Sequence, residues 1–187
     1  MSRTKFLAIA CLLSLASTGA NAVPIQFADN GHWYEYVSGT PSWQDARAAA
    51  LGSTFMGQSG YLATITSAAE NNFVYSLLLA AHGVGGWIGG TDAAVEGNFR
   101  WADGPEAGDL FSYTNWESTE PNNCCSGEDY VNLSTLQAGR WNDLGATDTY
   151  FRTGYFVEYN AVSEPGAITL LGLGLIGLGL TRRRKKI

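Results

Sequence analysis

Five side chains that could supply oxygen ligands lie in two short stretches of the sequence. Glu120, Asn122 and Glu128 fall close together, and Asn142 and Asp143 are adjacent further along the chain. Calcium binds six to eight oxygen atoms from carboxylates, amide carbonyls and water. Three carboxylates and two amides can offset a divalent charge and leave coordination positions open, so this set predicts a calcium site. The alternative is a group of solvated turn residues, because Asn and Asp also favour loops.

The charge distribution favours a cation over an anionic partner. The chain has 187 residues and a formal net charge of −6. Four of its basic and sixteen of its acidic residues lie between 23 and 160, which gives that segment a net charge of −12. A segment this acidic has no basic face for nucleic acid. With 45% hydrophobic and 15% charged residues, the chain can bury one ordinary core, which excludes a disordered protein and argues against a second full domain.

The remaining reactive residues do not form a recognisable catalytic set. His32 and His82 are far apart and outside any metal-ligand spacing, so both are expected to be surface or half-buried imidazoles. The sequence has no Ser-His-Asp or Cys-His arrangement with a nucleophile elbow. A glycoside hydrolase also uses paired carboxylates, but here the carboxylates coincide with calcium-ligand spacing. The chain is therefore predicted not to be an enzyme.

Residues 1–22 have the three regions of a secretory signal peptide in the required order. A basic start precedes the apolar run from Phe6 to Ala16, and Ala20-Asn21-Ala22 provides small residues for cleavage. The mature chain is then expected to begin at Val23. A short buried helix is the alternative, and it would not need these three regions in this order.

Only two cysteines, Cys124 and Cys125, remain after the predicted signal peptide. They are adjacent, so they cannot join distant segments, and they lie among the oxygen ligands. A vicinal disulfide, two free thiols and an intermolecular bridge are all compatible with this sequence.

The C-terminal end has the composition of a sorting signal. Ser163-Glu164-Pro165 precedes sixteen uncharged residues, 166–181, and then five basic residues. As a helix, the uncharged segment would span about 24 Å, somewhat short of a bilayer core of about 30 Å. Residues 161–187 resemble the PEP-CTERM sorting signal of Gram-negative bacteria, which implies processing by an exosortase-type enzyme. Membrane contact is expected only through this C-terminal helix.

Two helices and an early strand are expected before the candidate site. Residues 33–37 alternate aromatic and polar side chains, which predicts a strand. Ser42 with Asp45 predicts the start of a short helix that continues to Leu51. Ser67 and Glu70 form a capping box for a longer apolar-periodic helix that ends near residue 83.

A long irregular tract and two late strands complete the predicted architecture. After Trp87-Ile88-Gly89-Gly90, the chain is rich in Gly, Asn, Asp and Pro, and strands are expected at 130–133 and 155–159. Early helices with late loops and strands indicate an α+β fold. A long ordered loop tract is usually functional, so the tract is expected to carry the site.

Residues 23–160 resemble a C-type lectin-like domain through motifs that match in order and spacing. The resemblance implies a double-loop α+β domain with two helices, small antiparallel sheets and a long calcium-binding loop. The motifs are Gly60-Tyr-Leu-Ala-Thr-Ile65, Glu70-Asn71, Trp87-Ile88-Gly89-Gly90, Tyr113-Thr-Asn-Trp116, Glu120-Pro121-Asn122, Glu128-Asp129 and Trp141-Asn142-Asp143.

The resemblance also implies which ligands the loop binds. The five residues named first match the principal calcium site, where two sugar hydroxyls fill the open positions. Glu120-Pro121-Asn122, with a cis bond before the proline, accompanies equatorial 3- and 4-hydroxyls of the mannose type, whereas Gln-Pro-Asp accompanies galactose. An auxiliary calcium site, whose occupancy the sequence leaves open, is implied at Asp92, Glu96, Asn123 and Asp129.

This chain departs from the family at its cysteines. Tyr130 and Val157 stand where most members have cysteine, with Ala146 and Ala49 or Ala50 near the expected partners. Both usual disulfides are therefore absent, and the aromatic-rich core and bound calcium are expected to compensate. Trp116 and Trp141 are expected to pack beneath the loop rather than to contact sugar.

Together these features predict a secreted, calcium-dependent carbohydrate-binding module of a Gram-negative bacterium. Its partner would be a glycan or exopolysaccharide, and its location the cell envelope, cell surface or extracellular matrix. The alternative is an adhesive or structural module that binds protein and uses calcium only to order its loops.

Overall fold

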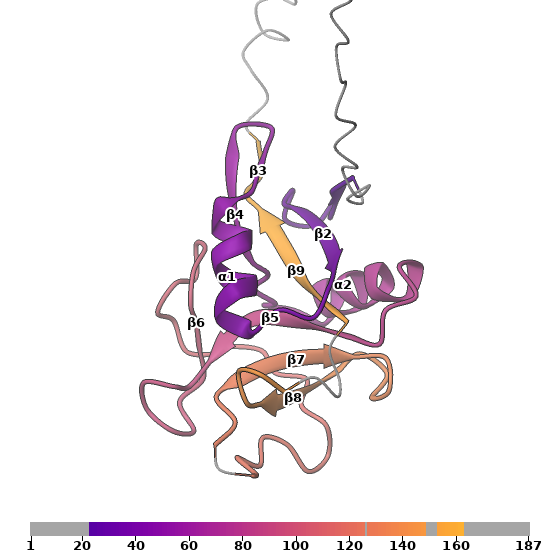
Figure 1. The fold of residues 1–187 in the computed structure, drawn as a ribbon. Helices are drawn as coiled ribbons and strands as arrows, with labels where there is room; N and C mark the ends of the chain where they lie inside the picture. Colours follow the sequence, from indigo (N-terminus) through magenta and orange to yellow (C-terminus); the bar gives the residue numbers. More distant parts are fainter. Residues whose placement is uncertain (1–22, 126, 149–152, 163–187) are drawn as a thin grey trace, which may run out of the picture.

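The computed structural model of the protein describes residues 23–125, 127–148 and 153–162 (Figure 1). Within these ranges the chain forms two helices and nine strands, which confirms the α+β class. The elements are β1 (Ile25–Gln26), β2 (Trp33–Ser38), α1 (Trp43–Gly52), β3 (Thr54–Phe55), β4 (Gln58–Leu62), α2 (Ala68–Ala80), β5 (Gly85–Thr91), β6 (Arg100–Trp101), β7 (Tyr130–Ser134), β8 (Arg140–Leu144) and β9 (Gly154–Tyr159).

The two predicted terminal signals fall outside this description. The signal peptide 1–22 and the apolar segment 166–181 belong to ranges that the structure does not describe. Among the residues that it does describe, neither helix has the length and hydropathy of a membrane-spanning segment.

Both helices begin at the caps that the sequence indicated. Ser42 Oγ accepts a hydrogen bond from the Asp45 N–H at 3.1 Å, and Ser67 Oγ accepts one from the Glu70 N–H at 3.2 Å. Each contact satisfies a backbone donor that would otherwise lack an intrahelical partner. The caps therefore fix where each helix starts relative to the strand before it.

Strand β9 connects the two halves of the sheet, whose order is β1-β2-β9-β5-β7-β8. It pairs with all six residues of β2 in antiparallel register, and its other edge contacts β4 and, through a parallel bridge between Trp87 and Tyr155, β5. The small antiparallel sheets implied by the resemblance are thus linked into one path.

The two helices cover opposite faces of β9. In Figure 1 the strand runs between α1 and α2. Phe156 packs in a cluster with Val74 and Leu78 of α2, whereas the next residue, Val157, packs in a second cluster with Ala50 of α1. This alternation follows from the two-residue period of a strand. Each side of β9 therefore has its own hydrophobic core.

Apolar and aromatic contacts occupy both positions where disulfides were predicted to be missing. Val157 and Ala50, rather than Ala49, are the buried pair at the first position. At the second, the Trp43 ring lies 4.7 Å from the Tyr130 ring, and the backbone N–H of Trp43 donates to the carbonyl oxygen of Ala146 at 3.0 Å. Packing thus replaces the covalent links.

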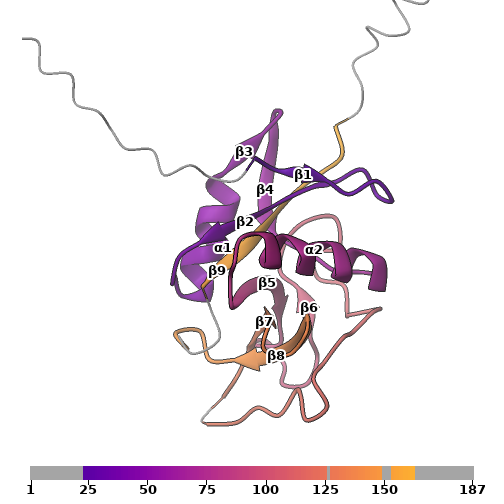
Figure 2. The same cartoon turned by 90° about the vertical axis from the view of Figure 1, so that its right-hand side faces the viewer.

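Strands β7 and β8 support the long loop that joins β6 to β7. This loop, 102–129, lies at the end of the molecule away from β1 and β3 (Figures 1 and 2). It is tied to β8 by a parallel bridge between Trp116 and Trp141, and its Glu120–Pro121 peptide bond is cis, as the resemblance implied. The candidate ligands therefore meet at one end of the fold.

Candidate functional site

The five predicted oxygen ligands lie in the loop and on the adjoining strand β8. The backbone N–H groups of Asn122 and Asn123 donate to the two carboxylate oxygens of Asp143, at 3.1 and 2.9 Å. The Cys124 N–H donates to Asn122 Oδ1 at 2.8 Å and to Glu128 Oε2 at 3.0 Å. Residues separated by more than twenty positions in the sequence are thereby brought into one cluster.

The pairing of β7 with β8 explains why these side chains meet. Asn142 is opposite Asn132, and Asp143 is opposite Val131. Because Glu128 lies shortly before β7, the antiparallel register brings it to the same sheet edge as Asp143. The loop then needs only to return Glu120 and Asn122 to this edge, which the hydrogen bonds to Asp143 achieve.

Two oxygens in the cluster are buried without a hydrogen-bond partner, Glu120 Oε2 and Asn142 Oδ1. Buried polar atoms are normally paired, so an unpaired oxygen needs an explanation such as a bound ion. Both atoms are also of the kind that calcium prefers. The donor set therefore fits a calcium ion, with Glu120, Asn122, Glu128, Asn142 and Asp143 as the residues that would hold it.

The carboxylates of the cluster repel one another. Burial is the main cause that raises the pKa of Glu120 to about 7, followed by its contact with Asp143 and the charges of Asp143, Glu128 and Glu117. Burial also raises the pKa of Glu128, and the charge of Asp143 adds to this effect, whereas the hydrogen bond from the Cys124 N–H opposes it. A cluster with this many neighbouring negative charges favours a cation.

The cluster has an exposed rim and a buried floor. Asp143 is 1% exposed, and Glu128 and Asn142 are each 7% exposed. Asn122 is exposed and Glu120 is half-buried. Ligands that approach from solvent would therefore meet Asn122 and Glu120 first, while Asp143 holds the loop from beneath.

The residues of the predicted auxiliary site lie next to this cluster. Two of them, Asp92 and Glu96, lie beside each other. Asp92 is buried, its Oδ2 accepts from the Gly97 N–H at 2.8 Å, and its Oδ1 has no hydrogen-bond partner. Burial raises its pKa, and the charges of Asp129 and Asp143 add to the effect. Glu96 is exposed beside Asp92.

Asn123, another residue of the predicted auxiliary site, makes a hydrogen bond within the loop. Its Oδ1 accepts a hydrogen bond from the Glu128 N–H at 2.9 Å, and its backbone has a positive φ of 46°. The side chain thus closes the turn that carries Glu128. Among the residues that the structure describes, no three His, Cys, Asp or Glu side chains form a metal-binding group, and the principal set depends on amide oxygens as well.

Cys124 and Cys125 form a vicinal disulfide within the loop. This is one of the three arrangements that the sequence left open. Since the Cys124 N–H donates to both Asn122 and Glu128, the disulfide lies beside the backbone group that orients two of the candidate ligands.

A buried carboxylate outside this cluster, Glu158, could not be inferred from the sequence. Glu158 of β9 is 1% exposed, and it accepts hydrogen bonds from the Thr64 N–H at 2.8 Å and from the Tyr34 hydroxyl at 3.0 Å. His32 Nδ1 lies 2.6 Å from Glu158 Oε1. His32 is half-buried, as expected, but its carboxylate partner could not be inferred from spacing because 126 residues separate them.

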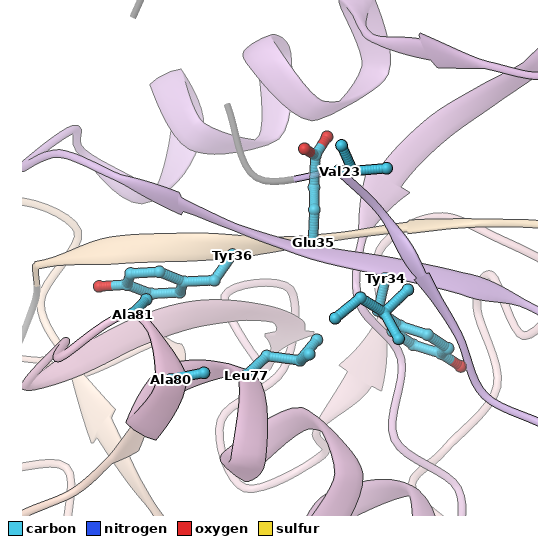
Figure 3. Close-up of a pocket in the computed structure, with 8 residues that line it drawn as sticks. Val23, Tyr34, Glu35, Tyr36, Leu77, Ala80 and Ala81 are labelled. Carbon is cyan, nitrogen blue, oxygen red and sulfur yellow. The ribbon is translucent and has the colours of Figure 1, made fainter. Parts of the chain in front are cut away.

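A small apolar cavity of about 150 Å³ lies between β2 and α2, lined by Val23, Tyr34, Tyr36 and Leu77 among others (Figure 3). In Figure 3 the carboxylate of Glu35 lies on the other side of β2 from Tyr34 and Tyr36. The Glu35 carboxylate accepts a hydrogen bond from the Tyr159 hydroxyl. The cavity therefore lacks the convergent polar groups of a ligand site.

Two family models match the sequence. A model described as the lectin C-type domain matches residues 39–151, and one described as the PEP-CTERM protein-sorting motif matches residues 161–185. The first is a lectin family and not an enzyme family, in agreement with the expectation that the chain is not an enzyme.

Two curated proteins illustrate how widely similar sequences occur. The chain is 34% identical over 175 residues to halomucin of Haloquadratum walsbyi, in an alignment that covers 83% of the chain but 2% of halomucin. It is 32% identical over 126 residues to an alpha-N-acetylgalactosamine-specific lectin of Patiria pectinifera, which covers 65% of the chain and 71% of that lectin.

Solved structures show the same fold. The C-type lectin CEL-I from Cucumaria echinata is 26% identical with a TM-score of 0.60, covering 72% of this chain and 94% of CEL-I. The C-type carbohydrate-recognition domain of cow CD23 is 28% identical with a TM-score of 0.57, covering 77% of this chain and all of that domain (100%).

Proposed function

Because this chain belongs to the C-type lectin domain family and ends in a PEP-CTERM sorting motif, we propose that it is an exported, calcium-dependent, carbohydrate-binding module. In this proposal, residues 1–22 direct export, 23–160 form the binding domain, and 161–187 sort the protein to the cell envelope, cell surface or matrix after recognition by an exosortase-type enzyme.

One observation carries the proposal. Two buried oxygens, Glu120 Oε2 and Asn142 Oδ1, lack partners in a cluster that also contains the carboxylates of Glu128 and Asp143. Calcium would supply a Lewis-acidic centre that accepts lone pairs from both these residues and two sugar hydroxyls. The exposed position of Asn122 leaves the approach from solvent open.

The side chains around that centre determine which hydroxyls fit. A carboxylate such as Glu120 or Glu128 accepts the proton of a sugar hydroxyl, whereas an amide such as Asn122 or Asn142 donates to its oxygen. Two adjacent hydroxyls must satisfy both kinds of contact at once. The order Glu120-Pro121-Asn122 supports equatorial 3- and 4-hydroxyls, as in mannose.

The name of the Patiria lectin points to a different sugar, N-acetylgalactosamine. Our assignment therefore depends on the residues of this chain and not on the specificity of its relatives. Galactose is the appropriate comparison sugar because its 4-hydroxyl is axial.

Retention of residues 23–162 on immobilised mannose tests the proposal. We expect binding in millimolar calcium, release by a chelator, competition by soluble mannose and little competition by galactose. Retention that persists in chelator would contradict calcium-dependent sugar binding and would favour the protein-binding alternative. A matched chelator titration with magnesium present separates calcium from nonspecific effects of divalent charge.

A further inference from the structure

A second concavity adjoins the candidate calcium cluster. It has a volume of about 270 Å³ and is lined by seven uncharged residues, namely Gly97, Phe99, Leu110, Phe111, Thr114, Trp116 and Pro121. From the sequence, Trp116 is expected to pack beneath the loop. The tryptophan does pack there, but it is half-buried and part of it faces this cleft.

The walls of the cleft are braced by aromatic contacts. The ring centroids of Phe99 and Trp116 are 4.8 Å apart, and those of Phe111 and Trp101 are 4.2 Å apart. Trp116 also meets the buried Trp141 edge-on at 5.7 Å. Because these rings hold one another in place, the cleft is a preformed surface that loses little conformational entropy when a ligand binds.

The cleft presents apolar surface to solvent. Leu110 is 52% exposed, and Phe111 and Trp116 are half-buried. Thr114 is exposed and adds a hydroxyl that can donate or accept a hydrogen bond. An apolar wall with one polar group suits a ligand that has both C–H faces and hydroxyl edges.

Pro121 connects the cleft to the calcium cluster. Its ring lines the cleft, while the residues on either side of it, Glu120 and Asn122, belong to the cluster. A sugar held by Glu120 and Asn122 therefore has its next covalent neighbour within reach of the cleft. The volume is slightly below the roughly 300–1,000 Å³ of sites for drug-sized ligands, which favours one ring over a longer chain.

We infer that this cleft is a subsite for the sugar unit adjacent to the one bound at the calcium cluster. The inference rests on the proposed function and adds that the ligand is an oligosaccharide. The C–H face of the second pyranose ring lies against Leu110, Phe111 and Trp116, and Thr114 contacts a hydroxyl at its edge. Removing this apolar surface from water supplies the gain in affinity.

Calorimetry with a monosaccharide and two disaccharides tests this inference at saturating calcium. Methyl mannoside reports on the first sugar alone. Mannobioses linked 1→2 and 1→6 add a second ring while leaving the 3- and 4-hydroxyls of the first sugar free. We expect at least one disaccharide to bind wild-type protein about tenfold more tightly than methyl mannoside, a difference of about 1.4 kcal/mol.

The variant Leu110→Glu places a carboxylate on the cleft wall at an exposed position. It should remove the disaccharide's advantage while leaving methyl mannoside affinity unchanged. Leu136→Glu is the matched control, because Leu136 is also exposed, at 64%, but does not line the cleft. Thr114→Trp, which fills the cleft, should have the same selective effect as Leu110→Glu.

The outcomes separate the two levels of the proposal. If neither saccharide binds wild-type protein, the proposed function itself is wrong. If methyl mannoside binds but no disaccharide binds more tightly, or if Leu110→Glu and Thr114→Trp behave like Leu136→Glu, only the subsite is overturned.

Discussion

Asp143 organises the candidate site by binding backbone and not by direct contact with solvent. Its two oxygens accept from the N–H groups of Asn122 and Asn123, and the side chain is 1% exposed. In the proposed function, the more exposed Glu120 and Asn122 would be the residues that contact sugar first. The proposal therefore assigns sugar recognition and loop positioning to different carboxylates of the same cluster.

Exchanging the two residues that flank Pro121 should change sugar specificity while largely preserving calcium binding. Glu120→Gln with Asn122→Asp retains two oxygen ligands and one negative charge. Donor and acceptor positions are reversed, however, and each mismatched hydrogen bond costs about 1 to 3 kcal/mol. We expect calorimetry at saturating calcium to show mannose affinity reduced tenfold or more, with galactose-type ligands favoured relative to mannose.

The control for this exchange is Asp29→Asn, a carboxylate-to-amide change at an exposed residue between β1 and β2. It should leave sugar affinity unaltered. Undiminished mannose binding by the double variant, with calcium still bound, would show that the sugar does not occupy this site.

The residues of the candidate set could be selected from the sequence because their chemistry and spacing are local. The hydrogen bonds between these residues could not be predicted from the sequence. One example is the hydrogen bond that Asn123 Oδ1 accepts from the Glu128 N–H, which no local pattern indicates. The cleft beside Pro121 has no local signal either, because Phe99 and Trp116, which are seventeen positions apart, are brought together by the fold of the loop against β8.

At the scale of elements, the central strand β9 contains a buried carboxylate, Glu158, which is unusual in a sheet interior. Thr64 and Tyr34 donate hydrogen bonds to it, and His32 lies beside it. Burial raises the pKa of Glu158. These partners connect β2, β9 and the segment after β4 through polar contacts as well as through packing.

The contact between His32 and Glu158 should be visible in a pH titration. The hydrogen bond to Glu158 is the main cause that raises the His32 pKa above 6.5, and the charges of Glu158, Glu106 and Glu70 add to it, whereas burial opposes it. We expect NMR titration to place this pKa above 6.5 in wild-type protein and lower in Glu158→Gln, which keeps an acceptor oxygen but loses the charge.

The direction in which pH changes the stability of the fold follows from the raised His32 pKa. A raised pKa in the folded state means that His32 contributes its full stabilisation below about pH 6.5 and loses it as the pH rises through the folded value. The Tyr34 hydroxyl also faces this pair, and it stays protonated because burial raises its pKa strongly. A His32 pKa at or below 6.5 in wild-type protein would contradict the assigned contact.

Two glycine-to-alanine substitutions should change the free energy of unfolding in opposite directions. A Cβ at Gly89 of β5 would lie 2.7 Å from the carbonyl oxygen of Leu62, and the Gly89 N–H already donates to Ala63 at 2.8 Å. Gly89→Ala should therefore lower the free energy of unfolding by about 1 to 3 kcal/mol. Gly52→Ala, at the end of α1, meets no atom within 4 Å and should raise it by about 0.4 to 1 kcal/mol.

Denaturant unfolding of both variants measures this difference. Equal effects would mean that the close approach of β5 to Leu62 does not limit side-chain size at position 89.

The helices were easier to predict than the strands. Ser42 and Ser67 are local signals that fix helix starts. Strand β5 contains Gly85, Gly86, Gly89 and Gly90, and glycine is depleted in strands. Its glycines reflect close packing with neighbours distant in sequence, which no local pattern reveals. The late strands at 130–133 and 155–159 were found because β-branched and aromatic residues dominate them.

At the scale of the whole molecule, two hydrophobic cores stabilise the domain. Among the described residues, no disulfide joins segments that are distant in the sequence. The negative charges of the loop cluster oppose folding unless they are neutralised. A cation bound there would therefore contribute to global stability as well as to recognition.

Calcium should raise the melting temperature of residues 23–162. A ligand at one hundred times its dissociation constant stabilises the folded state by about 2.7 kcal/mol, and it also relieves repulsion within the cluster. Differential scanning calorimetry of metal-free protein, with and without calcium, checks this. An unchanged melting curve up to several millimolar calcium would contradict the principal-site assignment, and Asp29→Asn should respond as wild type does.

The described chain begins at β1 and ends after β9, at the end of the molecule opposite β7, β8 and the loop 102–129 (Figures 1 and 2). If the protein is attached through its C-terminal segment, as we propose, the loop 102–129 lies at the end of the domain away from the point where the described chain ends. Many copies held on one surface would all present that loop outward to the same polymer. Once one copy has bound, its neighbours meet further sugar units at high effective concentration, so avidity can exceed single-site affinity by a factor on the order of 10² to 10⁴.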